Sequence, residues 1–133
     1  MEKELIIVKF GGSLITDKSS DTPQINNKHL KSISSILSQS KYDLIIVHGA
    51  GSFGHPIAKK FNIEKGLNDD IAQNNAIKKI RNLVRELNII FCEFLHKVGI
   101  KTETIVPSST MTTNGPKEII NFPYNLFSKA ISE

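Results

Sequence analysis

Between residues 43 and 56 the sequence is Asp43-Leu-Ile-Ile-Val-His-Gly-Ala-Gly-Ser-Phe-Gly-His-Pro56, an aliphatic run followed at once by a glycine-rich turn. The same arrangement occurs earlier, in Glu4-Leu-Ile-Ile-Val-Lys-Phe-Gly-Gly-Ser13. Nearly continuous aliphatic runs are typical of parallel strands that are covered on both faces. Open α/β sheets bind ligands at the carboxyl ends of such strands, where glycine lets main-chain N–H groups approach an anion closely. The two turns therefore predict a site for two phosphate groups.

Three further segments have the patterns of helices. Leu30, Ile33, Ile36 and Leu37 recur at helical spacing, and Asn26 or Asn27 precedes them as a candidate cap. Pro56 stands where the first turn of a second helix would begin, directly after the glycine-rich turn. From Ile71 to Val98 the apolar residues predict a long amphipathic helix, which Gly99 would end.

The last third of the chain predicts one more strand. Thr102 to Val106 is the expected third strand, and a turn-rich loop from Pro107 to Pro116 follows it. A short Glu118-Ile-Ile120 run and a terminal helix after Pro123 complete the chain. The order of these elements predicts one α/β domain, in which a parallel sheet lies between helices as an αβα sandwich.

Composition narrows the classes of partner and compartment. Seventeen basic and thirteen acidic side chains give a formal net charge of +4, an excess that suits a small anion as well as a polyanion. The basic residues are scattered and form no nucleic-acid signature, so we expect no nucleic-acid partner. Cys92 is the single cysteine, which excludes an intrachain disulfide and a cysteine metal cluster. The sequence shows neither a secretory signal nor an apolar run of roughly 20 residues, and these features predict a cytoplasmic protein without a membrane segment.

Individual residues of the turns each have a functional and an ordinary interpretation. His55 begins a predicted helix and would gain most from a phosphate there, although it could equally be a surface histidine at a cap. Lys9 ends an aliphatic strand, where a buried ammonium would need an anionic partner. Lys18 by itself has the pattern of a solvated loop residue. For Gly12 and Gly51, simple turn geometry is the alternative to ligand contact.

The glycine spacing alone does not identify a nucleotide-binding class. Gly49, Gly51 and Gly54 satisfy the G-x-G-x-x-G pattern, but the chain lacks the acidic residue expected at the end of the next strand of a dinucleotide-binding domain. A P-loop would need Lys-Ser/Thr where His55-Pro56 stands. The interpretation of the chain as a dehydrogenase therefore depends only on the spacing of the glycines.

Taken together, Lys9-Phe-Gly-Gly-Ser-Leu-Ile-Thr-Asp-Lys18 and His48-Gly-Ala-Gly-Ser-Phe-Gly-His-Pro56 resemble the amino acid kinase superfamily, and within it the isopentenyl phosphate kinases. The order of the motifs and the His55 ending carry this resemblance, and Val106-Pro-Ser-Ser109 also fits it. It extends over essentially the whole chain. It implies transfer of the γ-phosphoryl group of ATP, with Mg²⁺, to isopentenyl phosphate, giving the diphosphate used in isoprenoid biosynthesis and linked to the mevalonate pathway.

The resemblance also implies roles for individual residues. The predicted catalytic residues are Lys9, Lys18 and His55. The predicted contacts to ATP are Lys9, Phe10, Gly11, Gly12, Ser13 and Gly51, and those to the acceptor are Ala50, Gly51, Gly54 and His55. The isoprenoid tail would lie along apolar residues of the long helix. We expect a homodimer. We expect no metal site formed by protein side chains.

The chain differs from this family in length. Members continue for about as long again, with a second half that binds the nucleotide, so residues 1–133 would form an incomplete N-terminal, acceptor-binding domain. One alternative is a kinase with another phosphate or phosphonate acceptor, such as fosfomycin. An amino acid kinase that forms an acyl phosphate has less need of His55. A different alternative is a non-catalytic phosphate-binding module, or one half of a split protein with a separately encoded C-terminal half.

Overall fold

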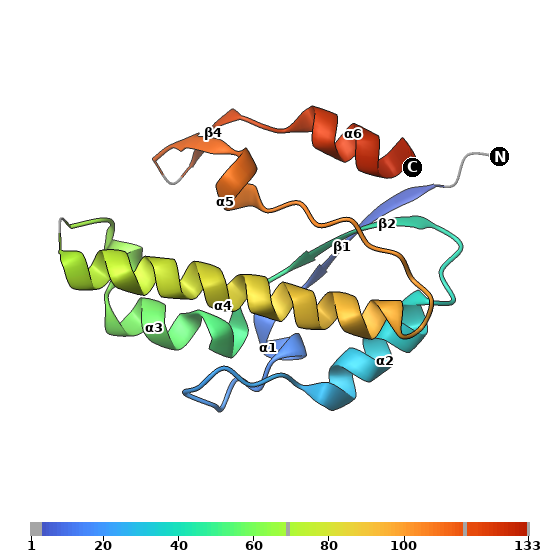
Figure 1. Cartoon of the computed structure of the whole chain (residues 1–133), viewed down its shortest axis with the longest axis horizontal. Helices are drawn as coiled ribbons and strands as arrows, with labels where there is room; N and C mark the ends of the chain where they lie inside the picture. The colour runs from blue at the N-terminus through green and yellow to red at the C-terminus, as the bar shows by residue number, and fades with distance from the viewer. Residues whose placement is uncertain (1–3, 69, 116, 133) are drawn as a thin grey trace. The chain divides into compact units, whose positions relative to one another are not determined.

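The structure is a computed structural model that describes residues 4–68, 70–115 and 117–132. The chain divides into two compact units, residues 1–100 and 101–133. The first contains both glycine-rich turns. Figure 1 shows the elements of each unit along the chain.

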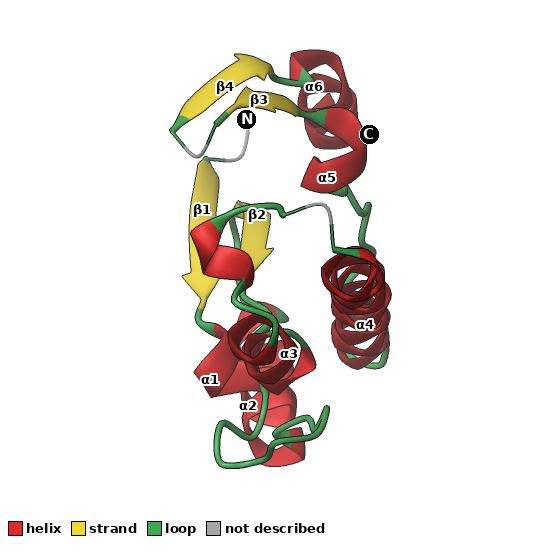
Figure 2. Ribbon diagram, turned by 90° about the vertical axis from the view of Figure 1, so that its left-hand side faces the viewer, coloured by secondary structure: helices red, strands yellow, loops and turns green. Residues whose placement is uncertain are grey.

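The first unit is built on a parallel pair of strands. β1 (Leu5–Phe10) and β2 (Asp43–His48) pair in parallel, and the register places Leu5 opposite Asp43 and Phe10 opposite His48. Both strand arrows in Figure 2 point toward α1 (Gly12–Ile15) and α3 (His55–Lys60). The carboxyl ends of the strands therefore carry the two glycine-rich turns, as predicted.

The helices of this unit begin and end at the predicted signals. α2 (Asn27–Leu37) is capped by Asn26, whose side-chain oxygen accepts a hydrogen bond from the backbone N–H of His29 at 3.1 Å. α4 (Ile71–His96) is capped by the Asp70 carboxylate, which accepts from the Ala72 N–H at 2.9 Å. Gly99 follows the end of α4 with φ +84°, a conformation that glycine adopts without a Cβ clash. The prediction of a long helix closed by Gly99 is confirmed.

The core lies between the helices and one face of the strand pair. α4 contributes three buried side chains spaced four residues apart, Leu87, Phe91 and Leu95. They form one cluster with buried residues of α1, α2 and the second turn, namely Ile15, Leu30, Ile33 and Phe53. Phe10 and Ile46 of the strands pack against this cluster. The core thus holds the strand ends and the turns on a common support.

The strands are not covered on both faces, contrary to the prediction. Along β1 exposed and half-buried residues alternate, and Ile7 is 68% exposed. Val47 of β2 is also exposed. The described helices of the first unit pack on one face only, so the aliphatic residues of the other face remain at the surface.

The second unit contains short elements. These are α5 (Pro107–Thr110), β3 (Thr112–Asn114), β4 (Glu118–Asn121) and α6 (Tyr124–Ser132). β3 and β4 form an antiparallel pair, so the Glu118 run is a strand and the helix after Pro123 is confirmed. Pro116, the last residue of the predicted loop, lies outside the described residues.

The predicted third strand from Thr102 to Val106 is wrong. Residues 101–106 have no regular secondary structure, and the parallel sheet contains β1 and β2 as its described strands. β-branched residues favour an extended chain, but a strand also needs a neighbour whose main chain pairs with it. The segment has strand propensity, but the structure gives it no regular secondary structure.

Candidate functional site

The two glycine-rich turns leave neighbouring strands at the same level. The Gly49 N–H donates to the Phe10 carbonyl at 3.1 Å, which continues the pairing of β1 and β2 by one residue. The first turn then enters α1, and the second enters a short 3₁₀ turn, Gly51–Phe53, and α3. The structure therefore brings together the two motifs that are 39 residues apart between Gly12 and Gly51.

The turns touch through their main chains. A Cβ on Gly12 would lie 2.7 Å from the Gly51 Cα, and a Cβ on Gly49 would lie 2.8 Å from the Gly12 nitrogen. Gly51 has φ +51°, and a Cβ there would lie 2.6 Å from the Gly12 carbonyl oxygen. Side chains at these positions would force the turns apart. The glycines are thus required by the contact between the turns, a reason that neither sequence interpretation contained.

A buried hydroxyl links the two turns. Thr16, only 1% exposed, donates through Oγ1 to the Gly12 carbonyl at 2.7 Å and accepts from the Ser52 N–H at 3.0 Å. Ser52 Oγ in turn bonds the backbone N–H and carbonyl of Gln24, each at 3.1 Å. This network fixes the turns to the segment around Gln24. Sequence reasoning missed Thr16 and Ser52, because a hydroxyl after a turn has no pattern that distinguishes it from a solvated one.

Main-chain donors remain available on both turns. Within the part of the chain that the structure describes, no atom accepts a hydrogen bond from the N–H groups of Gly12, Ser13, Ala50 or Gly51. Clusters of main-chain N–H groups at such turns bind anions. Gly12 and Ser13 also stand at the start of α1. These four donors are available to an anion, and the anion site stays a prediction.

Gly11 differs from the other glycines of the turns. It is exposed and has an extended conformation that any residue can adopt, with φ −60° and ψ 144°. A Cβ there would meet a single neighbour, Ser13 Oγ at 4.0 Å. The packing of the described residues does not require glycine at this position.

The three predicted catalytic side chains are all exposed. Lys9 lies on the exposed face of β1, so its ammonium is not buried and does not require an anionic partner as the sequence argument supposed. Lys18 follows the buried Thr16 by two residues, in a turn. His55 is the first residue of α3, a helix of six residues, and Gly54 precedes it as the cap.

Asp17, next to Lys18, has a locally fixed carboxylate. It accepts hydrogen bonds from the hydroxyl of Ser19 at 2.6 Å and from the backbone N–H of Ser19 at 2.9 Å. These two bonds, the hydroxyl first, lower the pKa of Asp17 below its ordinary value of 3.8. The carboxylate therefore accepts hydrogen bonds from Ser19 within its own turn.

Two predicted contact residues have packing roles. The Phe10 ring lies edge-on to Phe91, with centroids 5.8 Å apart, and is directed into the core cluster. Gly54 is buried, and a Cβ there would lie 2.8 Å from the Ala50 Cβ and 3.4 Å from Ile80 Cγ2. Gly54 therefore allows the second turn to approach α4, and it places apolar side chains of α4 beside Ala50.

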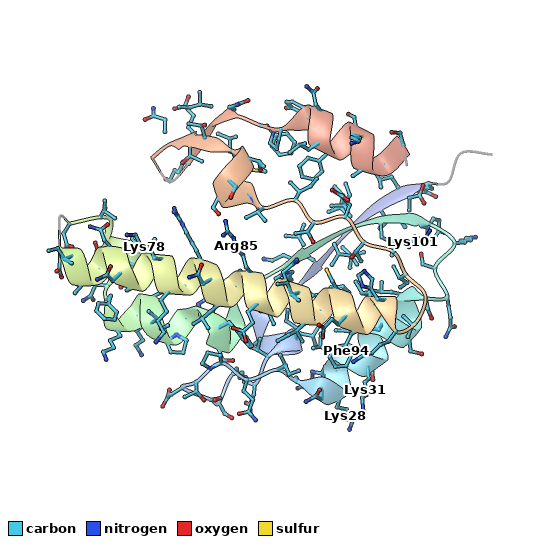
Figure 3. The ribbon with its side chains drawn as sticks, viewed as in Figure 1. Lys28, Lys31, Lys78, Arg85, Phe94 and Lys101 are labelled. Atoms are coloured by element: carbon cyan, nitrogen blue, oxygen red, sulfur yellow. The ribbon has the colours of Figure 1, made fainter. Side chains whose placement is uncertain are left out.

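Other features do not coincide with the turns. An apolar hollow of about 380 Å³ is lined by residues of α3 and α4 and the residue after α3, including Ile57, Phe61 and Ala76. A second hollow, of about 400 Å³, is lined by residues that include Phe61, Leu67 and Gln73. The basic side chains remain scattered: Figure 3 shows Lys28 and Lys31 on α2, and Lys78 and Arg85 on α4.

Two features are absent from the described residues. None of their helices combines the length and apolar character needed to cross a bilayer. No three His, Cys, Asp or Glu side chains in residues 4–68, 70–115 and 117–132 gather as a metal-binding group.

The chain is similar to known proteins over most of its length. The model of the amino acid kinase family matches residues 4–131. Isopentenyl phosphate kinase of Methanothermobacter thermautotrophicus is 38% identical over 109 residues, which are 79% of this chain and 41% of that protein. The enzyme of the same name from Methanocaldococcus jannaschii is 33% identical over 114 residues, 79% of this chain and 44% of that protein.

Solved structures give the same relationship. An X-ray structure of isopentenyl phosphate kinase superposes with a TM-score of 0.87 at 32% identity, covering 97% of this chain and 54% of the other. The product complex of the T. acidophilum isopentenyl phosphate kinase has a TM-score of 0.81 at 24% identity, a likeness of fold. This chain spans about half the length of the relatives that it matches. Its α/β fold with a parallel sheet is that of these kinases, and the match over residues 4–131 shows that the chain belongs to the amino acid kinase family.

Proposed function

We propose that the protein containing this chain transfers the γ-phosphoryl group of ATP to isopentenyl phosphate and forms isopentenyl diphosphate, in isoprenoid biosynthesis by the mevalonate pathway. The observation that carries the proposal is the meeting of the two glycine-rich turns, which leaves the N–H groups of Gly12, Ser13, Ala50 and Gly51 without a described acceptor. Relatives named isopentenyl phosphate kinase support the choice of acceptor.

We assign to these residues the roles that the family resemblance implies. Lys9 and the turn Gly11-Gly12-Ser13, with Phe10 as its support, hold the phosphates of ATP. Lys18 stabilises the charge on the transferred group. Ala50 and Gly51 present N–H groups between donor and acceptor, Gly54 keeps their turn against α4, and His55 donates to the acceptor phosphate. Exposure of the three charged or ionisable side chains makes each available to a ligand.

The transfer needs no covalent enzyme intermediate. An oxygen of isopentenyl phosphate attacks the γ-phosphorus, the new P–O bond forms, and the bond to the β-phosphate oxygen breaks with its electron pair leaving on ADP. N–H donors and ammonium groups fixed before the reaction stabilise the charge on the transferred oxygens. Mg²⁺, supplied with the nucleotide, would neutralise phosphate charge.

We place the isoprenoid tail along α4, next to the second turn. A Cβ on Gly54 would lie 3.4 Å from Ile80 Cγ2 and 3.8 Å from Val84 Cγ2, so both side chains reach the turn that would hold the acceptor phosphate. Both are half-buried. An apolar chain attached to a phosphate on Ala50 and Gly51 can therefore contact them directly.

The nucleotide side requires polypeptide equivalent to the second half of the relatives. This chain spans 41 to 54% of their lengths. Apolar side chains are exposed in both units, with Ile7 68% and Tyr124 72% exposed, and Ile120 of β4 is exposed as well. We propose that this polypeptide, continuous with the chain or separately encoded, covers such residues and completes the ATP site. We also propose a cytoplasmic homodimer; sedimentation equilibrium that shows a monomer would contradict the dimer.

A kinase assay of the 133-residue chain tests the proposal. With isopentenyl phosphate and ATP–Mg²⁺ we expect weak binding of the monophosphate and little or no turnover, and the Methanothermobacter enzyme serves as the positive control. Robust turnover would contradict the need for further polypeptide. Calorimetry with isopentenyl phosphate, inorganic phosphate and fosfomycin compares the acceptors, and failure of isopentenyl phosphate to bind better than the others would remove the proposed acceptor.

A further inference from the structure

His48, the last residue of β2, contacts the second glycine-rich turn through its ring. Its Nδ1 lies 3.1 Å from the carbonyl oxygen of Gly49, the first glycine of the turn. The ring is half-buried and lies edge-on to Phe91 of α4, with centroids 6.0 Å apart. The ring is therefore held between the strand end and the helix.

Asn88 of α4 holds the other side of the ring. Its Oδ1 lies 3.1 Å from His48 Nε2, and its Nδ2 donates to Cys92 Sγ at 3.8 Å. With Nδ2 directed to the sulfur, Oδ1 faces the imidazole. Both partners of the ring are oxygen atoms, which accept hydrogen bonds, so the ring donates through one nitrogen when neutral and through both when doubly protonated. A residue of the long helix thereby sets the ring orientation at the strand end.

This contact determines the direction of the next main-chain donor. The described peptide bonds are trans, so the N–H of Ala50 points away from the Gly49 carbonyl of the same peptide unit. A carbonyl held toward His48 turns the Ala50 N–H to the opposite side, where no described atom accepts it. Gly49 also packs against Gly12, which restricts the other movements of the unit.

We propose that His48 and Asn88 are positioning residues that orient the Ala50 N–H toward the acceptor phosphate. The proposal rests on the proposed function for the identity of the ligand. It adds that the donor on the second turn is set by a hydrogen-bonded pair in the strand and the long helix. Neither side chain needs to touch the phosphate.

NMR of the ¹⁵N-labelled chain, free and titrated with isopentenyl phosphate, tests this role. Asn88→Leu removes the oxygen at similar volume, and His48→Phe keeps the aromatic contact with Phe91 while it removes both nitrogens. Asn88→Asp keeps an oxygen acceptor opposite the His48 ring. Asn82→Leu makes a similar change at an exposed position of the same helix and serves as the matched control.

In the free chain we expect Asn88→Leu and His48→Phe to shift the Ala50 amide signal, while Asn88→Asp and Asn82→Leu leave it near the wild-type position. Loss of one oriented hydrogen-bond donor should weaken the binding of isopentenyl phosphate about tenfold in Asn88→Leu and in His48→Phe. Thermal unfolding of each variant separates this effect from loss of the fold, and two different substitutions guard against failure of either one.

The outcomes separate the two proposals. An unchanged Ala50 signal in both Asn88→Leu and His48→Phe would overturn the positioning role, whatever the ligand does. An Asn88→Asp variant that behaves like Asn88→Leu would also overturn it. If the signal moves as expected but the wild-type chain does not bind isopentenyl phosphate, the positioning role stands and the proposed function fails.

Discussion

The hydroxyl of Thr16 should contribute a measurable part of the stability of the first unit. Thr16→Val replaces the hydroxyl by a methyl group of nearly the same shape and keeps the β-branched side chain. It removes the bond to the Gly12 carbonyl at 2.7 Å and the acceptor of the Ser52 N–H at 3.0 Å. The Gly12 carbonyl still accepts from the Thr16 N–H at 2.9 Å, but the Ser52 N–H, in a buried residue, would have no partner.

The size of the effect follows from these two losses. A buried N–H left without an acceptor costs about 1–3 kcal/mol, and a lost neutral hydrogen bond costs about 0.5–1.5 kcal/mol. Because the Gly12 carbonyl keeps a partner, the second cost lies at the lower end of its range. We expect Thr16→Val to lower the free energy of unfolding by about 2–3 kcal/mol. Thr16→Ser, which keeps the hydroxyl and loses a buried methyl group, should cost about 1 kcal/mol.

Urea denaturation followed by circular dichroism measures the difference. With a slope of about 2 kcal/mol per molar urea, the midpoint of Thr16→Val should fall by about 1–1.5 M. Thr22→Val is the control, because that hydroxyl is exposed and bonds Ser20 at the surface. A Thr16→Val midpoint equal to that of Thr22→Val would show that the bridge between the turns does not stabilise the fold, and our account of the site would be wrong.

Three further predictions concern single residues of the site. Gly11→Ala should leave the free energy of unfolding within about 0.5 kcal/mol of wild type, because a Cβ there has space. In a protein with a complete nucleotide side, the same substitution should weaken the binding of ATP. Unfolding and nucleotide titrations measure the two effects, and unchanged ATP affinity would contradict the ligand role. Ser19→Ala should raise the pKa of Asp17 toward 3.8, since the hydroxyl bond is the largest cause of its lowering. The stability from this group, present above its ordinary pKa and lost as pH falls through the folded value, should then be smaller. NMR titration of the Asp17 carboxyl carbon checks this, and an unmoved midpoint would disprove it. His55→Ala should weaken isopentenyl phosphate binding about tenfold and spare ATP, with His96→Ala as the control; equal loss of both ligands would refute the assigned roles.

Local patterns in the sequence were enough to predict the elements that build the first unit. β1, β2, the cap at Asn26 and the end of α4 near Gly99 follow from aliphatic runs, a side-chain acceptor and a residue that tolerates positive φ. These features depend on neighbours a few residues away, so the sequence contains them directly. The amino acid kinase family was also evident, because the order of the two motifs is a property of the sequence.

Local sequence patterns gave wrong predictions where the outcome depends on distant segments of the chain. Residues 102–106 are rich in β-branched side chains, yet they have no regular secondary structure. The aliphatic runs of β1 and β2 suggested cover on two faces, and the described helices of the first unit cover one. Pairing and cover both depend on where other segments lie, which local composition does not specify.

The sequence by itself determined that two glycine-rich turns follow two parallel strands and that the chain belongs to the amino acid kinase family. Only the tertiary structure decided why each glycine is there: Gly12, Gly49 and Gly51 are required by main-chain contact between the turns, whereas Gly11 has space around it. It also placed the Thr16 hydroxyl between the two turns and the His48 ring beside Asn88. Contacts between residues 36 or 40 positions apart depend on the packed core, and no local pattern encodes them.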